Sequence, residues 1–183
     1  LQEVAMEKQI DRYLVVAVDK AHARFFSLVD SDTPEIESGP DLVETGAMIQ
    51  PENEMHDEAV FTTTKTGANT SPGNGKMHSY DDHRSRHNKE FARRFSGDIA
   101  AQVKRQVHNR NTRDIILVAQ ASMLGMLRPR IEEFLGPQQN LHSVGKEVGR
   151  LSPRQIHELL ADENLLPPRR SAGDQMGARR RHA

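Results

Sequence analysis

The chain has 183 residues, of which 36% are hydrophobic and 4% aromatic, and its formal net charge is −1. This length fits one domain with extensions, and the absence of cysteine excludes disulfides, thiolate metal sites and cysteine nucleophiles. The longest apolar runs are too short to span a membrane, and residues 1–12 lack the apolar stretch of a signal peptide. We therefore predict a cytoplasmic protein that does not insert into membranes.

The charge is unevenly distributed along the chain. Ser31 to Thr64 holds nine acidic residues and no lysine or arginine, whereas Lys76 to Arg113 holds ten lysines and arginines against four acids. The stretch after Leu165 has five arginines and one aspartate. Such polarity is typical of a solvated face, and it is also what a protein with an anionic partner needs.

The first half of the chain predicts strands followed by a long loop. Two stretches rich in apolar and β-branched residues, 13–18 and 23–29, flank a turn at 19–22. This pattern predicts a strand pair over Arg12 to Val29. Turn residues fill 30–40, and 41–49 is suited to a further strand. Residues 50–79 are polar and rich in Thr, Gly, Asn and Pro, so we expect a long mobile loop there.

A regular pattern returns after the loop. Phe91, Phe95, Ile99, Val103 and Val107 recur every four residues, which predicts one amphipathic helix over 83–107 with a buried stripe. A continuous apolar strand is expected over 114–120, as for a strand buried on both faces. It should be followed by a helix over 122–135, a strand over 141–148 and a last helix that ends near 161.

The last helix has a clear start signal. Ser152 is placed as its N-cap and Pro153 as its first helical residue. The alternation of strands and helices after residue 80 predicts an α/β fold, a mixed β-sheet flanked by helices. We divide the chain into an N-terminal extension over 1–11, one domain over 12–162 that contains the loop 50–79, and a disordered basic tail over 163–183.

The order and spacing of several segments resemble the bacterial host attachment protein family. These segments are Val18 to Phe26, His87 to Phe95, Ile115 to Ala119, Leu124 to Leu127 and Leu151 to Pro153. That family is similar in turn to the central domain of archaeal and eukaryotic class 1 release factors. The resemblance implies a ribonuclease-H-like or release-factor-central-domain-like fold with a long loop before its main helix.

The resemblance does not extend to peptide release. In release factors the loop carries a Gly-Gly-Gln tripeptide, whereas Ser71 to Lys76 reads Ser-Pro-Gly-Asn-Gly-Lys here. What the resemblance implies is a Gly-rich, positively flanked loop suited to RNA or ribosome. The family's label implies the alternative, a role in attachment to host cells.

No catalytic set emerges from the sequence. His83 and His87 are spaced to share a metal ion on one helix face, but Arg84 stands where a zinc protease has glutamate, and a solvated helix entrance is the simpler interpretation. Asp19 and Asp114 lie at strand ends, where a nuclease would place metal-binding carboxylates, yet each also suits a turn or a strand start. We expect no enzyme activity, no metal site and no cofactor.

The predicted binding surface is basic. Lysines and arginines lie on the helix over 83–107 and in the loop before it, and they would neutralise phosphates, while aromatic side chains for base stacking are nearly absent. The residues predicted to bind RNA or ribosome are Lys65, Gly73, Asn74, Gly75, Lys76, Tyr80, Arg84, Arg86, Lys89, Arg93, Arg94, Lys104 and Arg105.

The sequence thus predicts a non-enzymatic, translation-associated binding module that recognises shape and backbone rather than base sequence. The first alternative is a host-attachment or other protein–protein interaction role, and the second is a hydrolase. The sequence leaves the oligomeric state and the specific partner open.

Overall fold

The computed structural model describes residues 9–31, 38–50 and 79–170, with side chains described for 12–31, 38–50 and 88–170. The strands are β1 (Gln9–Val18), β2 (His22–Val29), β3 (Asp41–Ile49), β4 (Asp114–Ala119) and β5 (Asn140–Gly145). The helices in this part of the chain are α2 (Ser79–Asn109), α3 (Ala121–Glu132) and α4 (Pro153–Asp162).

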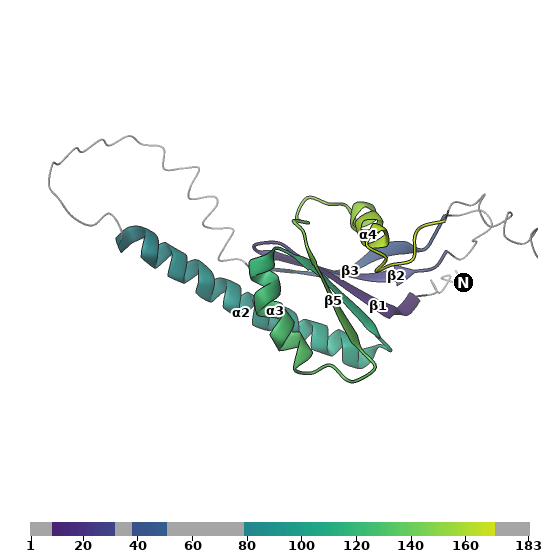
Figure 1. Cartoon of the computed structure of the whole chain (residues 1–183), viewed down its shortest axis with the longest axis horizontal. Helices are drawn as coiled ribbons and strands as arrows, with labels where there is room; N and C mark the ends of the chain where they lie inside the picture. Colours follow the sequence, from purple (N-terminus) through teal and green to yellow (C-terminus); the bar gives the residue numbers. More distant parts are fainter. Residues whose placement is uncertain (1–8, 32–37, 51–78, 171–183) are drawn as a thin grey trace, which may run out of the picture.

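The five strands form one mixed sheet in the order β3-β2-β1-β4-β5 (Figure 1). β2 runs antiparallel to both of its neighbours, with Phe26 opposite Val15 of β1 and opposite Glu44 of β3. β1, β4 and β5 are parallel, so their carboxyl ends meet at one edge of the sheet. The predicted strand pair at 12–29 is confirmed, and so is the α/β fold with a mixed sheet flanked by helices.

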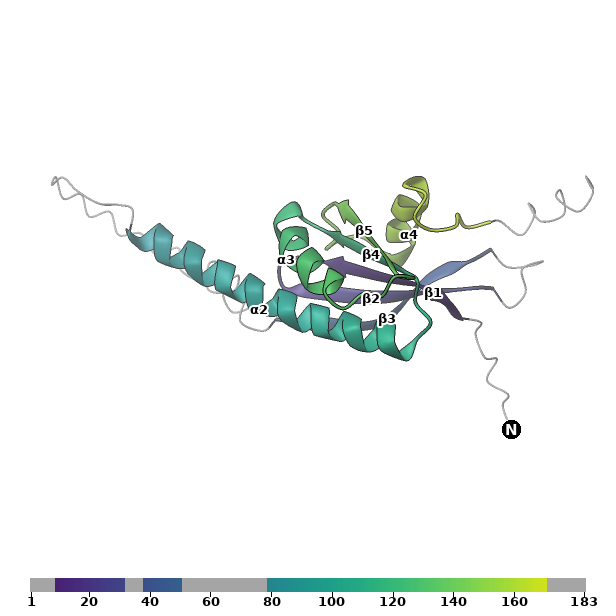
Figure 2. The same ribbon diagram turned by 60° about the horizontal axis from the view of Figure 1, so that its bottom comes forward.

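Helices cover both faces of the sheet. α2 and α3 pack on one face, where Phe95, Ile99 and Val103 contact apolar side chains of β1, β2 and β4. α4 packs on the other face through Ile156 and Leu160 (Figure 2). All six residues of β4 are buried, because β4 lies between β1 and β5 and helices cover both faces of the sheet.

The predicted amphipathic helix is confirmed and is longer than expected. α2 spans 31 residues, and its five stripe residues from Phe91 to Val107 are all buried. The first part of α2 extends past the sheet in both ribbon views (Figures 1 and 2). Within the part of α2 whose side chains are described, 88–109, the buried stripe begins at Phe91, and from there the helix packs on the sheet.

Several predicted boundaries move in the structure. β5 ends at Gly145 instead of 148, because the chain turns where Lys146 N–H donates to the Val144 carbonyl. α3 ends at Glu132 rather than 135, because the helix gives way to a turn at Glu133 and Phe134. The predicted loop 50–79 falls almost entirely outside the described residues.

The folded part also exceeds the predicted domain, 12–162, at both ends. β1 begins at Gln9. Beyond α4, Leu166 is 4% exposed, and the backbone of Arg170 exchanges two hydrogen bonds with Gly39, at 2.8 and 3.2 Å. Arg169 also pairs with Asp41, at 2.8 Å. The beginning of the predicted tail therefore packs along the start of β3.

Candidate functional site

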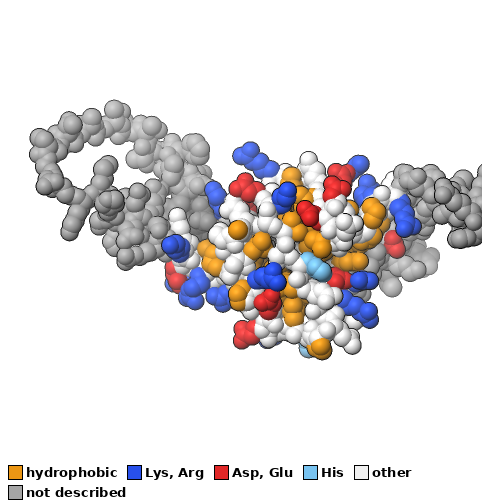
Figure 3. Space-filling model, viewed as in Figure 1, with side chains coloured by type: hydrophobic (Ala, Val, Ile, Leu, Met, Phe, Trp, Pro, Cys, Tyr) orange, Lys and Arg blue, Asp and Glu red, His pale blue; other side chains and the backbone are white. Residues whose placement is uncertain are grey.

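The exposed side of α2 carries the predicted cations whose side chains the structure describes. The stripe at 91, 95, 99, 103 and 107 faces the sheet, with Ser96 and Ala100 buried beside it, so the residues on the opposite side of the helix face away from the sheet. The exposed cations, which we call the α2 basic side, are Lys89, Arg93, Arg94, Lys104 and Arg105. Basic side chains gather where α2 leaves the folded domain, at the left of the described surface in Figure 3.

One acid, Glu90, holds two of these cations. Arg93 donates to both carboxylate oxygens of Glu90 at 3.0 Å, and Arg94 Nε donates to Glu90 Oε1 at 3.3 Å. These contacts, above all the hydrogen bond from Arg93, lower the pKa of Glu90 to about 2. Glu90 is therefore a carboxylate at every ordinary pH, and the three side chains together carry a net charge of +1 instead of +2.

The other two described cations have weaker partners. Arg105 donates to the amide oxygen of Gln102 through Nε at 3.0 Å and through Nη2. The Lys104 ammonium lies 5.8 Å from the centre of the Phe134 ring, just after α3. Neither contact neutralises a charge, so Lys104 and Arg105 keep their full positive charge toward solvent.

The remaining predicted residues lie partly outside the described structure. Tyr80, Arg84 and Arg86 belong to α2, as do His83 and His87, but their side chains are not among those described. The predicted loop residues, which are outside the described ranges altogether, are Lys65, Gly73, Asn74, Gly75 and Lys76. Within the described residues, no group of three or more His, Asp and Glu side chains is placed to hold a metal ion.

A polar cluster surrounds Asp114 at the edge of the sheet where the parallel strands β1, β4 and β5 begin. The Asp114 carboxylate accepts hydrogen bonds from Arg12 Nε at 2.7 Å and Asn140 Nδ2 at 3.1 Å, and it lies 3.3 Å from His142 Nε2. Burial opposes ionisation of Asp114, but these hydrogen bonds outweigh it and lower its pKa below the ordinary value. Asp114 thus ties β4 to β1 and β5.

The two strand-end aspartates are too far apart to share a metal ion. Tyr13 is the register partner of Asp114, and Asp19 lies six residues further along the same strand direction. At about 3.3 Å per residue, Asp19 is roughly 20 Å from Asp114, whereas the ions of a two-metal site are about 4 Å apart. Asp19 instead forms the predicted turn, in which its N–H donates to the His22 carbonyl at 2.8 Å.

These features define an α/β domain with an extended, exposed helix side of mixed but net positive charge. The chain belongs to the family described as "Protein required for attachment to host cells", which matches residues 14–160. The resemblance to the host attachment proteins is therefore confirmed, while the relationship to release factors stays a prediction.

Comparisons with solved structures and with curated proteins add no evidence on function beyond the family match. A solved chain described as an archaeal protein aligns at 10% identity and a TM-score of 0.39, covering 85% of this chain. This chain spans 35% of the length of that archaeal protein. No curated protein matches the sequence. None of the helices in the described ranges combines the length and the apolar content that a membrane crossing needs.

Proposed function

We propose that this protein is a non-enzymatic binding module that contacts structured RNA, ribosomal RNA included, through the α2 basic side. The observation that supports this proposal is the charge of an exposed, firmly held helix side. Residues 88–109 place five exposed cations against two acids, Glu90 and Asp98. Phosphates would be attracted by this surplus, and each contact would release counterions.

The spacing of the cations suits a row of phosphates. Lys89 and Arg105 lie sixteen residues apart on one helix, which is about 24 Å at 1.5 Å per residue. This reach covers several phosphates along an RNA strand. The planar guanidinium of arginine can also exchange a carboxylate for a phosphate, because it binds both in the same bidentate geometry.

A non-enzymatic role fits the way the strand-end carboxylates are used. Asp114 is engaged by side chains from β1 and β5, and Asp19 lies at the other end of the strands in a turn. The Gly-Gly-Gln tripeptide of peptide release is missing from the sequence. Binding to RNA would place the protein in the cytoplasm.

The RNA proposal is tested by measuring binding of a fluorescein-labelled RNA hairpin to the full chain as salt is raised. We expect the affinity to fall steeply with salt, since the contacts are to phosphates. A single-stranded RNA of the same composition should bind more weakly if shape is recognised. Affinity that does not depend on salt would refute an interface formed by the α2 basic side.

The family favours a second candidate function, attachment to a protein partner at a host cell. This candidate needs neither RNA nor a salt-dependent helix contact. Affinity purification of the tagged full chain with and without ribonuclease treatment separates the two functions. Partners lost after ribonuclease treatment support the RNA module, and a direct partner that survives both ribonuclease and high salt supports attachment through protein contacts.

A further inference from the structure

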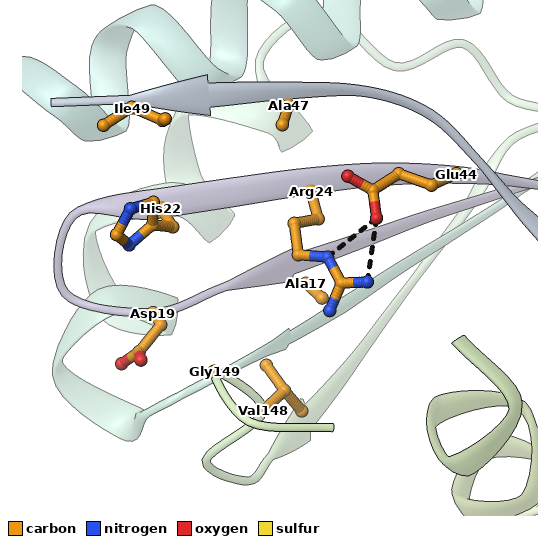
Figure 4. Close-up of a pocket in the computed structure, with 9 residues that line it drawn as sticks. All are labelled: Ala17, Asp19, His22, Arg24, Glu44, Ala47, Ile49, Val148 and Gly149. Atoms are coloured by element: carbon orange, nitrogen blue, oxygen red, sulfur yellow. Dashed lines mark hydrogen bonds and ion pairs between the residues drawn. The ribbon is translucent and has the colours of Figure 1, made fainter. Parts of the chain in front are cut away.

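A pocket lies on the face of the sheet opposite α2, at the carboxyl end of β1 (Figure 4). Its volume is about 360 Å³, near the lower end of small-ligand sites, which begin at about 300 Å³. β1, β2 and β3 form its floor, and Val148 and Gly149 of the segment after β5 form its far wall. Ligands of open α/β sheets bind at this edge, outside the carboxyl ends of the strands.

An arginine ties the wall of the pocket to its floor. Arg24 donates through Nε to Glu44 Oε2 at 2.9 Å and through Nη1 to the carbonyl of Leu151 at 2.8 Å, and its Nη2 forms an ion pair with the same Glu44 oxygen at 2.8 Å. Its guanidinium carbon also lies 4.9 Å from the centre of the Phe26 ring. Glu44 therefore balances the charge of Arg24, and the segment before α4 is held over the sheet.

The charge left in the pocket is negative. Asp19 and Glu44 contribute −2 and Arg24 contributes +1, so the lining carries −1 with histidine counted as neutral. Because Glu44 is committed to Arg24, the charge that has no ion-pair partner among the described lining residues is that of Asp19. Lys20, the next residue in the chain, does not line the pocket.

The Asp19 carboxylate lies against Gly149 at the pocket wall. Oδ1 accepts a hydrogen bond from the Lys20 N–H at 2.8 Å. A Cβ atom added to Gly149 would lie 1.9 Å from Asp19 Oδ2 and 2.8 Å from its Cγ, so only glycine leaves room for the carboxylate where it stands.

Apart from the charged residues, His22 and Gly149, the lining is aliphatic. Ala17, Ala47, Val148 and Ile49 surround the polar groups, and Ile49 is 54% exposed although it is a large apolar side chain. An aliphatic wall beside one unbalanced carboxylate complements an apolar stem that ends in a cation. An anionic ligand would meet Asp19 and an arginine that is already paired.

We infer that this pocket binds an aliphatic cation, with an ammonium or guanidinium group against Asp19 and the aliphatic stem against Ala17, Val148 and Ile49. Such a group is carried by free aliphatic amines and by lysine or arginine side chains of a protein partner. This site is independent of the proposed RNA contact, because it lies on the other face of the sheet and its charge would repel phosphate.

The test measures binding to the full chain by NMR titration. The ligand probe is Nα-acetyl-lysine methylamide, and its matched control is the norleucine analogue, which has the same stem but no ammonium. We expect the lysine compound to bind about tenfold more tightly or better, as for a charge-assisted hydrogen bond in a partly enclosed site. Asp19→Asn, which keeps an oxygen for the Lys20 N–H, should abolish that preference.

Two further variants complete the test. Asp162→Asn removes an exposed acid at the end of α4 and should leave the preference unchanged. Ile49→Ser, at an exposed position, should weaken both compounds because it removes stem contacts. A lysine preference that survives in Asp19→Asn, or tighter binding of Nα-acetyl-glutamate methylamide than of the lysine compound, would overturn the inference.

Two additional probes, n-butylamine and a lysine-containing pentapeptide, distinguish a free amine from a protein side chain as the source of the cation. Tighter binding of the peptide than of the lysine compound supports a protein side chain as the natural occupant. Binding of n-butylamine without binding of the peptide supports a free amine. If n-butylamine and the peptide both fail to bind, the pocket recognises an aliphatic cation from neither source, and the inference is overturned.

Discussion

Glu90 offers the sharpest perturbation of the proposed RNA contact. In Glu90→Gln the ion pairs to Arg93 and Arg94 are lost, and the net charge of the three side chains rises from +1 to +2. Both arginine side chains are already largely exposed, at 60% for Arg93 and 63% for Arg94, so their guanidiniums can turn toward phosphates once the ion pairs are lost. Removing an acid should therefore strengthen binding.

The magnitude follows from one additional phosphate contact. The slope of log affinity against log salt should steepen by about 0.7–0.9. At low salt the affinity for an RNA hairpin should rise about fivefold, the size of one charge–charge contact in a high-dielectric surface setting. Arg93→Gln combined with Arg94→Gln should do the opposite, flattening the slope by about 1.5 and weakening binding at least tenfold.

Fluorescence anisotropy of a labelled hairpin across a salt series measures both quantities. Asp162→Asn is the matched control, because it makes the same change in net charge near α4 on the other face of the sheet. Thermal unfolding by circular dichroism checks that each variant is folded. Equal gains in Glu90→Gln and Asp162→Asn would show that only net charge matters, and no gain in Glu90→Gln would refute a contact at Arg93 and Arg94.

Three further predictions concern stability, each measured by urea unfolding. Phe95→Ala should cost about 3–5 kcal/mol, since Phe95 is 3% exposed between α2 and the sheet; a loss under about 1 kcal/mol would contradict the packing. Ser152→Ala should cost about 1 kcal/mol, because it removes the capping box with Gln155, and an unchanged midpoint would contradict that cap. Asp114→Ala should cost about 2–4 kcal/mol by leaving the Arg12, Asn140 and His142 donors without their acceptor. Because the folded pKa of Asp114 is lowered from 3.8, its stabilisation is complete well above pH 3.8 and is lost as the pH falls through the folded value. The stability gap between wild type and Asp114→Ala should therefore shrink in acid, and a constant gap would contradict this assignment.

Local patterns were enough to predict the elements. The four-residue spacing from Phe91 to Val107 fixes which side of α2 is buried, and the run from Ile115 to Ala119 fixes a central strand. The pairing of Glu90 with Arg93 and Arg94 also carries a local signal, an acid three and four residues before two arginines. Sequence reasoning treated the two arginines as free and missed the acid that binds them.

The two polar sites could not be predicted because they depend on register. Asp114 meets Arg12 and Asn140 only when β4 lies between β1 and β5 in parallel, and those residues are 102 and 26 positions away. The pocket needs Gly149 against Asp19, a contact that follows from the path of the chain between β5 and α4. No periodicity or spacing in the sequence predicts the contacts of Asp114 with Arg12 and Asn140, or the contact of Gly149 with Asp19.

The central claim is that the α2 basic side binds structured RNA, and sedimentation with ribosomal subunits tests it most directly. The tagged full chain would be run through a density gradient with subunits at low and at high salt, beside the Arg93→Gln, Arg94→Gln double variant. The account predicts that the wild-type protein migrates with a subunit at low salt and leaves it at high salt, and that the folded double variant stays at the top of both gradients. A folded double variant that migrates with subunits as well as wild type does, or a wild-type protein that never enters the gradient, would contradict it.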